Sequence, residues 1–258
     1  MTTTSDARDA DAPAGTGSRA TAWLGGAVLV GLALLAYLGL VAAPEDDLME
    51  DAVRIIFVHV PVAILTYVCF GVTAVGSVMW LWKRSVWWDT VAHAAAEIGV
   101  LCCGLTLATG AIWGRPTWGT YWEWGDVRLV TTLILFLIMV GYLSVRSIGG
   151  DEQAVATRAA VIGLIGAVNI PIVNRSVNWW FDRTLHQQSS LTDGKLEGLT
   201  LFTLTLGFVV LGMAVLWLLI HRFRVGWLER EVRGQALDDA LDARRAEALA
   251  GGTPEAGA

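Results

Sequence analysis

Six long apolar runs alternate with shorter polar segments along the chain. The runs cover residues 21–43, 55–82, 90–112, 128–145, 159–173 and 198–220. About 20 apolar residues in a helix cross the roughly 30 Å hydrocarbon core of a bilayer. A chain inside lipid must also satisfy its own backbone polar groups, as a helix does. The pattern therefore predicts an all-α, polytopic membrane protein with about six transmembrane helices, in a membrane domain over 21–221.

Two polar tails flank this domain. Residues 1–20 are rich in Ala, Thr, Asp and Gly, which predicts a disordered tail. Residues 222–258 are charged and rich in Ala, and we expect a second solvent-exposed tail, which could form a solvated amphipathic helix. The first apolar run is too long for the apolar h-region of a typical signal peptide. Its last small residues still resemble a cleavage site, so processing near Ala43 stays open.

Composition agrees with a lipid environment. The chain is 55% hydrophobic and 16% charged, whereas soluble domains are nearer one quarter charged. The net charge is −6, and the sequence has no basic stripe that would favour nucleic acid. The three cysteines lie inside apolar runs and form no C-x-x-C motif, so we interpret them as small apolar filler: Cys69, Cys102 and Cys103.

The charges at the run ends predict the orientation. Counted up to Arg233, ten Lys and Arg residues lie on the side of the two termini and six on the other side. Cytoplasmic loops carry the excess of positive charge. We therefore expect both termini in the cytoplasm. This topology places His59 and His186 on the outer side with the loop of residues 113–127, and His93 and His221 on the opposite side.

The loop of residues 113–127 is crowded with aromatic side chains separated by glycines: Trp113, Trp118, Tyr121, Trp122 and Trp124. Trp and Tyr also anchor helix ends at membrane interfaces, but one or two rings suffice for that and no glycine is needed. Glycine permits tight turns and close approach of the backbone, and large rings supply contact area at low entropic cost. The loop therefore predicts a platform for a flat, apolar ligand.

Charged and titratable groups flank this platform. Arg115 and Arg128 can pair with carboxylates of such a ligand, although Arg128 can equally be a side chain that reaches back to the membrane interface. Asp126 either caps the next helix or contacts the ligand. His59 and His186 are candidate axial ligands of a planar metal macrocycle. Ordinary packing is the alternative for both histidines.

Three stretches resemble a known family. They are RIIFVHVPVA around His59, the aromatic loop from Trp113, and NWWFDRTLHQ around His186. The loop resembles the tryptophan-rich "WWD" signature of the haem-handling superfamily. The order of the three stretches and the six-run setting resemble the haem exporter protein C (CcmC) family of bacterial cytochrome c maturation. The resemblance covers roughly residues 20–222.

The resemblance implies a cofactor, a function and partners. The family presents haem b at the outer membrane face and has two outer histidines as axial ligands, matched here by His59 and His186. The haem is loaded onto the haem chaperone CcmE, and the protein assists its covalent attachment without independent enzymatic activity. The small subunit CcmD and the ABC transporter subunits CcmA and CcmB complete the assembly. The family's haem platform, which also contacts the chaperone, is matched here by Trp113, Trp118, Tyr121, Trp122, Trp124 and Asp126. Arg115 and Arg128 would pair with the haem carboxylates.

One departure from the family motif lies at Gly125. It stands between Trp124 and Asp126, where the family has Trp followed directly by Asp. The role of Asp126, as helix cap or as ligand contact, therefore stays open.

Two other functions are alternatives. A cytochrome c synthetase of the same superfamily uses a similar loop, but outer loops of at most about 25 residues leave little room for a cytochrome-docking domain. A solute or haem permease subunit is the second alternative. The chain lacks the P-loop motif of an ATPase, and charge within the runs is sparse. Glu97 is the exception, and packing or reach to the interface is the simpler explanation for it.

Overall fold

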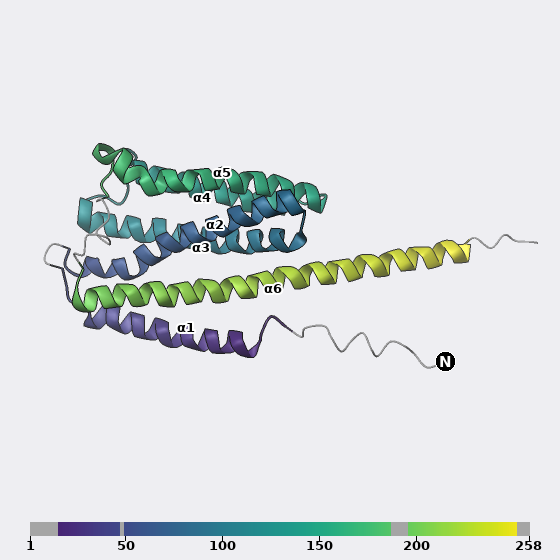
Figure 1. Ribbon diagram of the computed structural model, residues 1–258, viewed down its shortest axis with the longest axis horizontal. Coiled ribbons are helices and arrows are strands. Elements are labelled where there is room, and N and C mark those ends of the chain that lie inside the picture. The colour runs from purple at the N-terminus through teal and green to yellow at the C-terminus, as the bar shows by residue number, and fades with distance from the viewer. Residues whose placement is uncertain (1–14, 47–48, 187–195, 252–258) are drawn as a thin grey trace, which may run out of the picture. The chain divides into compact units, whose positions relative to one another are not determined.

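The computed structural model describes residues 15–46, 49–186 and 196–251, and these residues form six long helices (Figure 1). The helices are α1 (Arg19–Tyr37), α2 (Ile56–Lys83), α3 (Val86–Trp118), α4 (Val127–Ser147), α5 (Glu152–Trp179) and α6 (Gly198–Gly251). A π-helical turn, η1 (Leu38–Ala42), extends α1. The 3-10 turns η2 (Asp51–Ile55) and η3 (Phe181–Arg183) precede α2 and follow α5. The predicted all-α class is confirmed.

All six helices are long and apolar enough to cross a membrane. Their residues match the six apolar runs, and a helix satisfies its own backbone groups in lipid. The chain is therefore a multi-pass membrane protein. Most of the tail predicted to be disordered, residues 1–14, lies outside the described residues, and α1 begins at Arg19.

Three helices extend beyond the apolar runs that predicted them. The third was expected over 90–112 but continues to Trp118, where Gly119 ends it with a positive φ of 79°. The fifth begins at Glu152, because the Asp151 side chain accepts a hydrogen bond from Ala154 N at 2.8 Å. The sixth continues past residue 220 to Gly251. Hydropathy marks where lipid ends, whereas the helical hydrogen bonds continue until a cap or a glycine stops them.

The chain divides into two compact units, one of residues 17–220 and a second whose described residues are 15–16 and 221–251. In the first unit α2, α3, α4 and α5 share one buried core, made of Phe70, Ala96, Cys103, Leu135, Met139, Tyr142, Ala159 and Val173. The cysteines are buried, as expected of apolar filler. Close packing needs a glycine where α6 meets α2, since a Cβ on Gly207 would lie 2.5 Å from the carbonyl oxygen of Phe57.

One end of this core is joined by polar contacts, and we call it the ion-pair end. There the Arg146 guanidinium of α4 donates to the carboxylate of Asp89 on α3, with an Nη1–Oδ2 distance of 3.2 Å. It also donates to the Tyr142 hydroxyl at 2.9 Å. Arg84 at the end of α2 donates to the Thr157 hydroxyl of α5 at 2.8 Å. These contacts join α4 to α3 and α2 to α5 at this end.

Candidate functional site

The first histidine of the candidate site is His59, one turn into α2. Its Nδ1 lies 2.9 Å from the Thr109 hydroxyl of α3. The Trp113 ring meets it edge-on, with 5.6 Å between ring centroids. Gly110 makes room for the imidazole, because a Cβ there would lie 3.0 Å from His59 Cε1. The end of α3 therefore forms a seat for His59, built from three residues within one helical turn or so.

The second histidine, His186, follows η3. Its ring lies against Trp118, the last residue of α3, with 4.6 Å between centroids. Its Nδ1 is 3.7 Å from Oδ2 of Asp126 and has no hydrogen-bond partner among the described residues. Each histidine is thus paired with a tryptophan from the end of α3. We call this region, where α2 and α4 begin and α3 and α5 end, the histidine end.

The Asp126 side chain links the start of α4 to the segment that precedes His186. It is buried, and its Oδ1 accepts a hydrogen bond from Leu129 N at 2.9 Å, which caps α4. Its Oδ2 accepts from Leu185 N at 2.6 Å and from the Thr184 hydroxyl at 3.1 Å. Burial alone would raise the pKa of Asp126, but the neighbouring His186 ring and the two backbone amides outweigh it and hold the pKa at about 2. The structure therefore shows the capping role for this carboxylate.

The aromatic residues occupy two different settings. Trp113 and Trp122 are partly buried, and their indole N–H groups have no hydrogen-bond partner among the described residues. Tyr121 and Trp124 are 61% and 73% exposed. Trp113 and Trp118 are helical, so the loop itself spans only residues 119–126, shorter than the expected 113–127. The loop folds back closely, because a Cβ on Gly114 would lie 2.9 Å from the Thr120 carbonyl oxygen.

The two arginines also differ. Arg115 donates to the Gly119 carbonyl and lies 5.8 Å from the centroid of the exposed Tyr121 ring. Arg128 is partly buried at the start of α4 and donates from Nη2 to the Asn174 carbonyl at 3.3 Å. Its Nε has no partner within the described ranges. Arg128 therefore joins the start of α4 to α5 at the histidine end, whereas Arg115 supports the exposed part of the loop.

Comparison with known proteins decides the family. The family model described as CcmC, heme exporter protein C, matches residues 9–238. The chain belongs to this family.

Individual members of the CcmC family agree with that assignment. A heme exporter protein C from Bradyrhizobium diazoefficiens is 38% identical over 221 residues, which cover 84% of this chain and 82% of the relative. One from Haemophilus influenzae is 37% identical over 218 residues, covering 80% and 83%. A putative cytochrome c biosynthesis ccmC-like mitochondrial protein from Marchantia polymorpha is 40% identical over 160 residues, covering 62% and 66%.

The other two histidines of this CcmC-family chain are engaged elsewhere. His93 lies on α3 and its Nε2 is 3.5 Å from the Glu97 carboxylate, one turn further along the helix. His221 Nδ1 is 2.9 Å from the Thr16 hydroxyl, in the second unit. Glu97, the exceptional charge within an apolar run, thus has a partner on its own helix.

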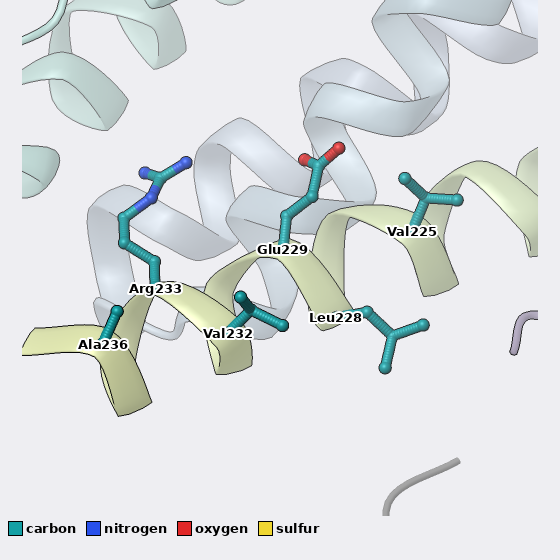
Figure 2. Close-up of a pocket in the computed structure, with 6 residues that line it drawn as sticks. All are labelled: Val225, Leu228, Glu229, Val232, Arg233 and Ala236. Atoms are coloured by element: carbon teal, nitrogen blue, oxygen red, sulfur yellow. The ribbon is translucent and has the colours of Figure 1, made fainter. Parts of the chain in front are cut away.

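The second unit carries a pocket of its own. Figure 2 shows that its lining comes from one helix, the C-terminal part of α6, through Val225, Leu228, Glu229, Val232, Arg233 and Ala236. The spacing of three and four residues puts most of these side chains on one helix face. This open, mostly apolar surface brings together none of the expected site residues.

Several residues of the site escaped the sequence analysis. Thr109 and Gly110 hold His59, Asn174 meets Arg128, and Thr184 meets Asp126. One signal was available: Thr109 precedes Trp113 by four residues, so the two share a helix face. The contacts of Asn174 and Thr184 cross between segments far apart in sequence, and no local pattern marks them.

Proposed function

We propose that this chain handles haem in cytochrome c maturation, with haem b held at the histidine end. One observation carries the proposal: His59 and His186 lie at one end of a membrane bundle, each against a tryptophan ring. The names of its relatives support it, since they are heme exporter proteins and a putative cytochrome c biosynthesis protein.

The donor set fits haem better than a bare metal ion. Within the described ranges, no three His, Cys, Asp or Glu side chains gather as an all-protein metal site requires. When bound, haem would supply an iron that takes ligands from the protein, a flat apolar ring and two carboxylates. Two imidazoles would provide those iron ligands. His59 and His186 are the residues that would hold it.

Other groups at the site fit the ring and its carboxylates. The buried N–H groups of Trp113, Trp122 and Arg128 lack partners among the described residues, and a buried donor without a partner is costly. Carboxylates of a ligand would satisfy them. Tyr121 and Trp124 are exposed and so remain available to a protein partner, which we propose is the haem chaperone CcmE.

The wider setting follows from the family. We propose that CcmD, CcmA and CcmB complete the assembly in the bacterial inner membrane. The excess of Lys and Arg on the side of the termini supports cytoplasmic termini and a histidine end on the outer face. Cysteine-accessibility labelling tests this orientation, in a variant whose three native cysteines are replaced. Positions 59 and 186 should react from the outer side, and position 157 at the ion-pair end from the inner side. Reaction of 59 and 186 from opposite sides would overturn the topology.

A visible absorption spectrum of the detergent-purified protein tests haem binding directly. We expect a low-spin spectrum of iron with two imidazole ligands. His59→Ala and His186→Ala should each abolish that spectrum, whereas His93→Ala should keep it, because His93 pairs with Glu97 elsewhere on α3. If both single variants at the site retain an unchanged low-spin spectrum, the axial assignment is wrong.

Reconstitution separates chaperone loading from the cytochrome c synthetase alternative. Purified haem-loaded protein is mixed either with the haem chaperone or with an apocytochrome, and covalently bound haem is measured on each acceptor after denaturing electrophoresis. Haem on the chaperone supports our proposal. Haem on the apocytochrome alone would favour the synthetase.

A further inference from the structure

The two imidazoles of the site face different oxygen atoms. The Nδ1 of His59 meets a neutral hydroxyl, that of Thr109, whereas the Nδ1 of His186 faces a carboxylate, that of Asp126. An oxygen partner at one ring nitrogen fixes which nitrogen carries the proton. The chemistry of these partners therefore bears on the nitrogen that remains for a metal.

The hydrogen-bond pattern around Thr109 assigns the tautomer of His59. A threonine hydroxyl has a single proton to donate. Here that hydroxyl donates to the carbonyl oxygen of Leu105 at 2.7 Å, one turn earlier on α3. Its 2.9 Å contact with His59 Nδ1 must then be one in which the imidazole donates. The proton of the neutral ring is on Nδ1, and Nε2 keeps its lone pair.

The surroundings of His186 lead to the same nitrogen by another route. Its Nδ1 is buried, lacks a hydrogen-bond partner within the described ranges, and lies 3.7 Å from Asp126 Oδ2. That oxygen is held in place by Leu185 N and the Thr184 hydroxyl. A carboxylate at this position favours the proton on Nδ1 and leaves Nε2 of His186 free. The carboxylate carries a full charge, so it polarises its imidazole more than a hydroxyl does.

We propose that Thr109 and Asp126 are positioning residues that present Nε2 of both histidines and make the two axial bonds unequal, with His186 the stronger donor. The proposal rests on the proposed haem site. It adds which ring nitrogen binds, which residue behind each imidazole orients it, and which ligand is the more easily displaced, namely His59.

Resonance Raman spectroscopy of five-coordinate ferrous haem in single-histidine variants tests the inequality. His59→Gly leaves the His186 bond and His186→Gly leaves the His59 bond. The iron–imidazole stretching frequency should be higher in His59→Gly. Adding Asp126→Asn to His59→Gly should lower that frequency to near the value for His186→Gly. Equal frequencies in the two single variants, or no shift with Asp126→Asn, would overturn the proposal.

A second measurement uses the protein with both histidines, in case a single-histidine variant does not keep haem. Asp126→Asn should raise the midpoint potential of bound haem, because a weaker donor stabilises ferric iron less. Thr109→Val should shift the potential by less, and Thr109→Ser should restore the wild-type value. Thr90→Val is the matched control, since Thr90 makes the same hydroxyl-to-carbonyl bond on α3, to Val86 at 2.9 Å, without a histidine.

The outcomes separate this inference from the function on which it rests. If wild-type protein shows no low-spin spectrum with two imidazoles, the proposed function fails. If that spectrum is present and each histidine variant loses it, the function stands. Unchanged potentials in Asp126→Asn and Thr109→Val would then show that the two residues do not tune the ligands.

Discussion

The two ends of the four-helix core differ in how many of their buried polar side chains have hydrogen-bond partners among the described residues. At the ion-pair end, the Arg146 guanidinium donates to Asp89 and to Tyr142, although its Nε has no partner among the described residues. At the histidine end, unpartnered groups accumulate on four side chains within the described ranges: Trp113, Trp122, Arg128 and His186. Both ends are built from the same four helices, so the difference does not come from the fold class.

Among the described residues, this difference separates an end whose buried groups pair with one another from an end where several buried groups lack partners. A buried charge pair contributes to holding helices together, because removing one member leaves the other uncompensated. A cluster of unpartnered donors has the opposite effect and is retained where a ligand supplies the missing partners. We therefore expect substitutions at the ion-pair end to change stability, and substitutions at the histidine end to change ligand binding.

The largest effect is expected at the ion-pair end. Asp89→Ala leaves the buried Arg146 guanidinium without its carboxylate and should lower the free energy of unfolding by about 3–5 kcal/mol. Unfolding in detergent, followed by circular dichroism, measures this loss. The spectrum of bound haem should keep its shape in the fraction that remains folded. A stability loss equal to that of an exposed substitution, such as Asp242→Ala, would contradict the comparison.

Loss of a ring at the histidine end should act on binding instead. Trp118→Ala removes the surface against which His186 packs and should weaken haem binding by roughly thirty-fold, about 2 kcal/mol, a typical cost for a buried tryptophan contact. Haem titration followed by absorbance provides the measurement. Trp82→Ala is the control, because Trp82 is 75% exposed at the other end of α2. Equal affinities in the two variants would remove Trp118 from the site.

A single added methyl group tests the seat of His59. Gly110→Ala places a Cβ 3.0 Å from Cε1 of the ring, which cannot move away without straining its bond to Thr109. We expect about tenfold weaker haem binding, near 1.4 kcal/mol. Gly104→Ala on the same helix is the matched control, since its Cβ would meet Phe136 at an ordinary 3.5 Å. If Gly110→Ala binds haem as Gly104→Ala does, the imidazole is not tightly seated.

The smallest expected effect lies at the exposed edge of the ion-pair end. Thr157→Val removes the hydroxyl that accepts from Arg84 at 2.8 Å and from Trp80 at 3.4 Å. Because Arg84 is exposed, the loss in unfolding free energy should be about 1 kcal/mol or less. Haem affinity should stay at the wild-type value. A weakened haem affinity here would show that the two ends are coupled.

The helices could be predicted from the sequence because lipid imposes a simple rule on each run. The position of His59 and His186 relative to the aromatic residues followed from the helix count alone, and the structure brings each beside a tryptophan; their roles stay proposals. The rotation of each helix was not predictable, since it depends on packing between distant segments. That is why Thr109 was missed and why the choice between the roles of Asp126 stayed open.

The expected start of the aromatic loop was wrong for a related reason. The apolar run ends at residue 112, but α3 continues to Trp118, although Pro116 within it has no N–H to donate to the helix. Hydropathy describes the solvent around a segment and not its backbone conformation. As a consequence, two of the tryptophans expected in the loop, Trp113 and Trp118, belong to helix α3.

The carboxylate that caps α4 also receives the backbone of a segment 59 residues further along the chain. While a ribosome is still delivering the third and fourth helices to the membrane, that partner has not yet been synthesised. A nascent chain can therefore expose its first imidazole but cannot yet offer the second. Under the function proposed above, both axial ligands are present only after the fifth helix has been inserted, so a partly made chain lacks the complete haem site.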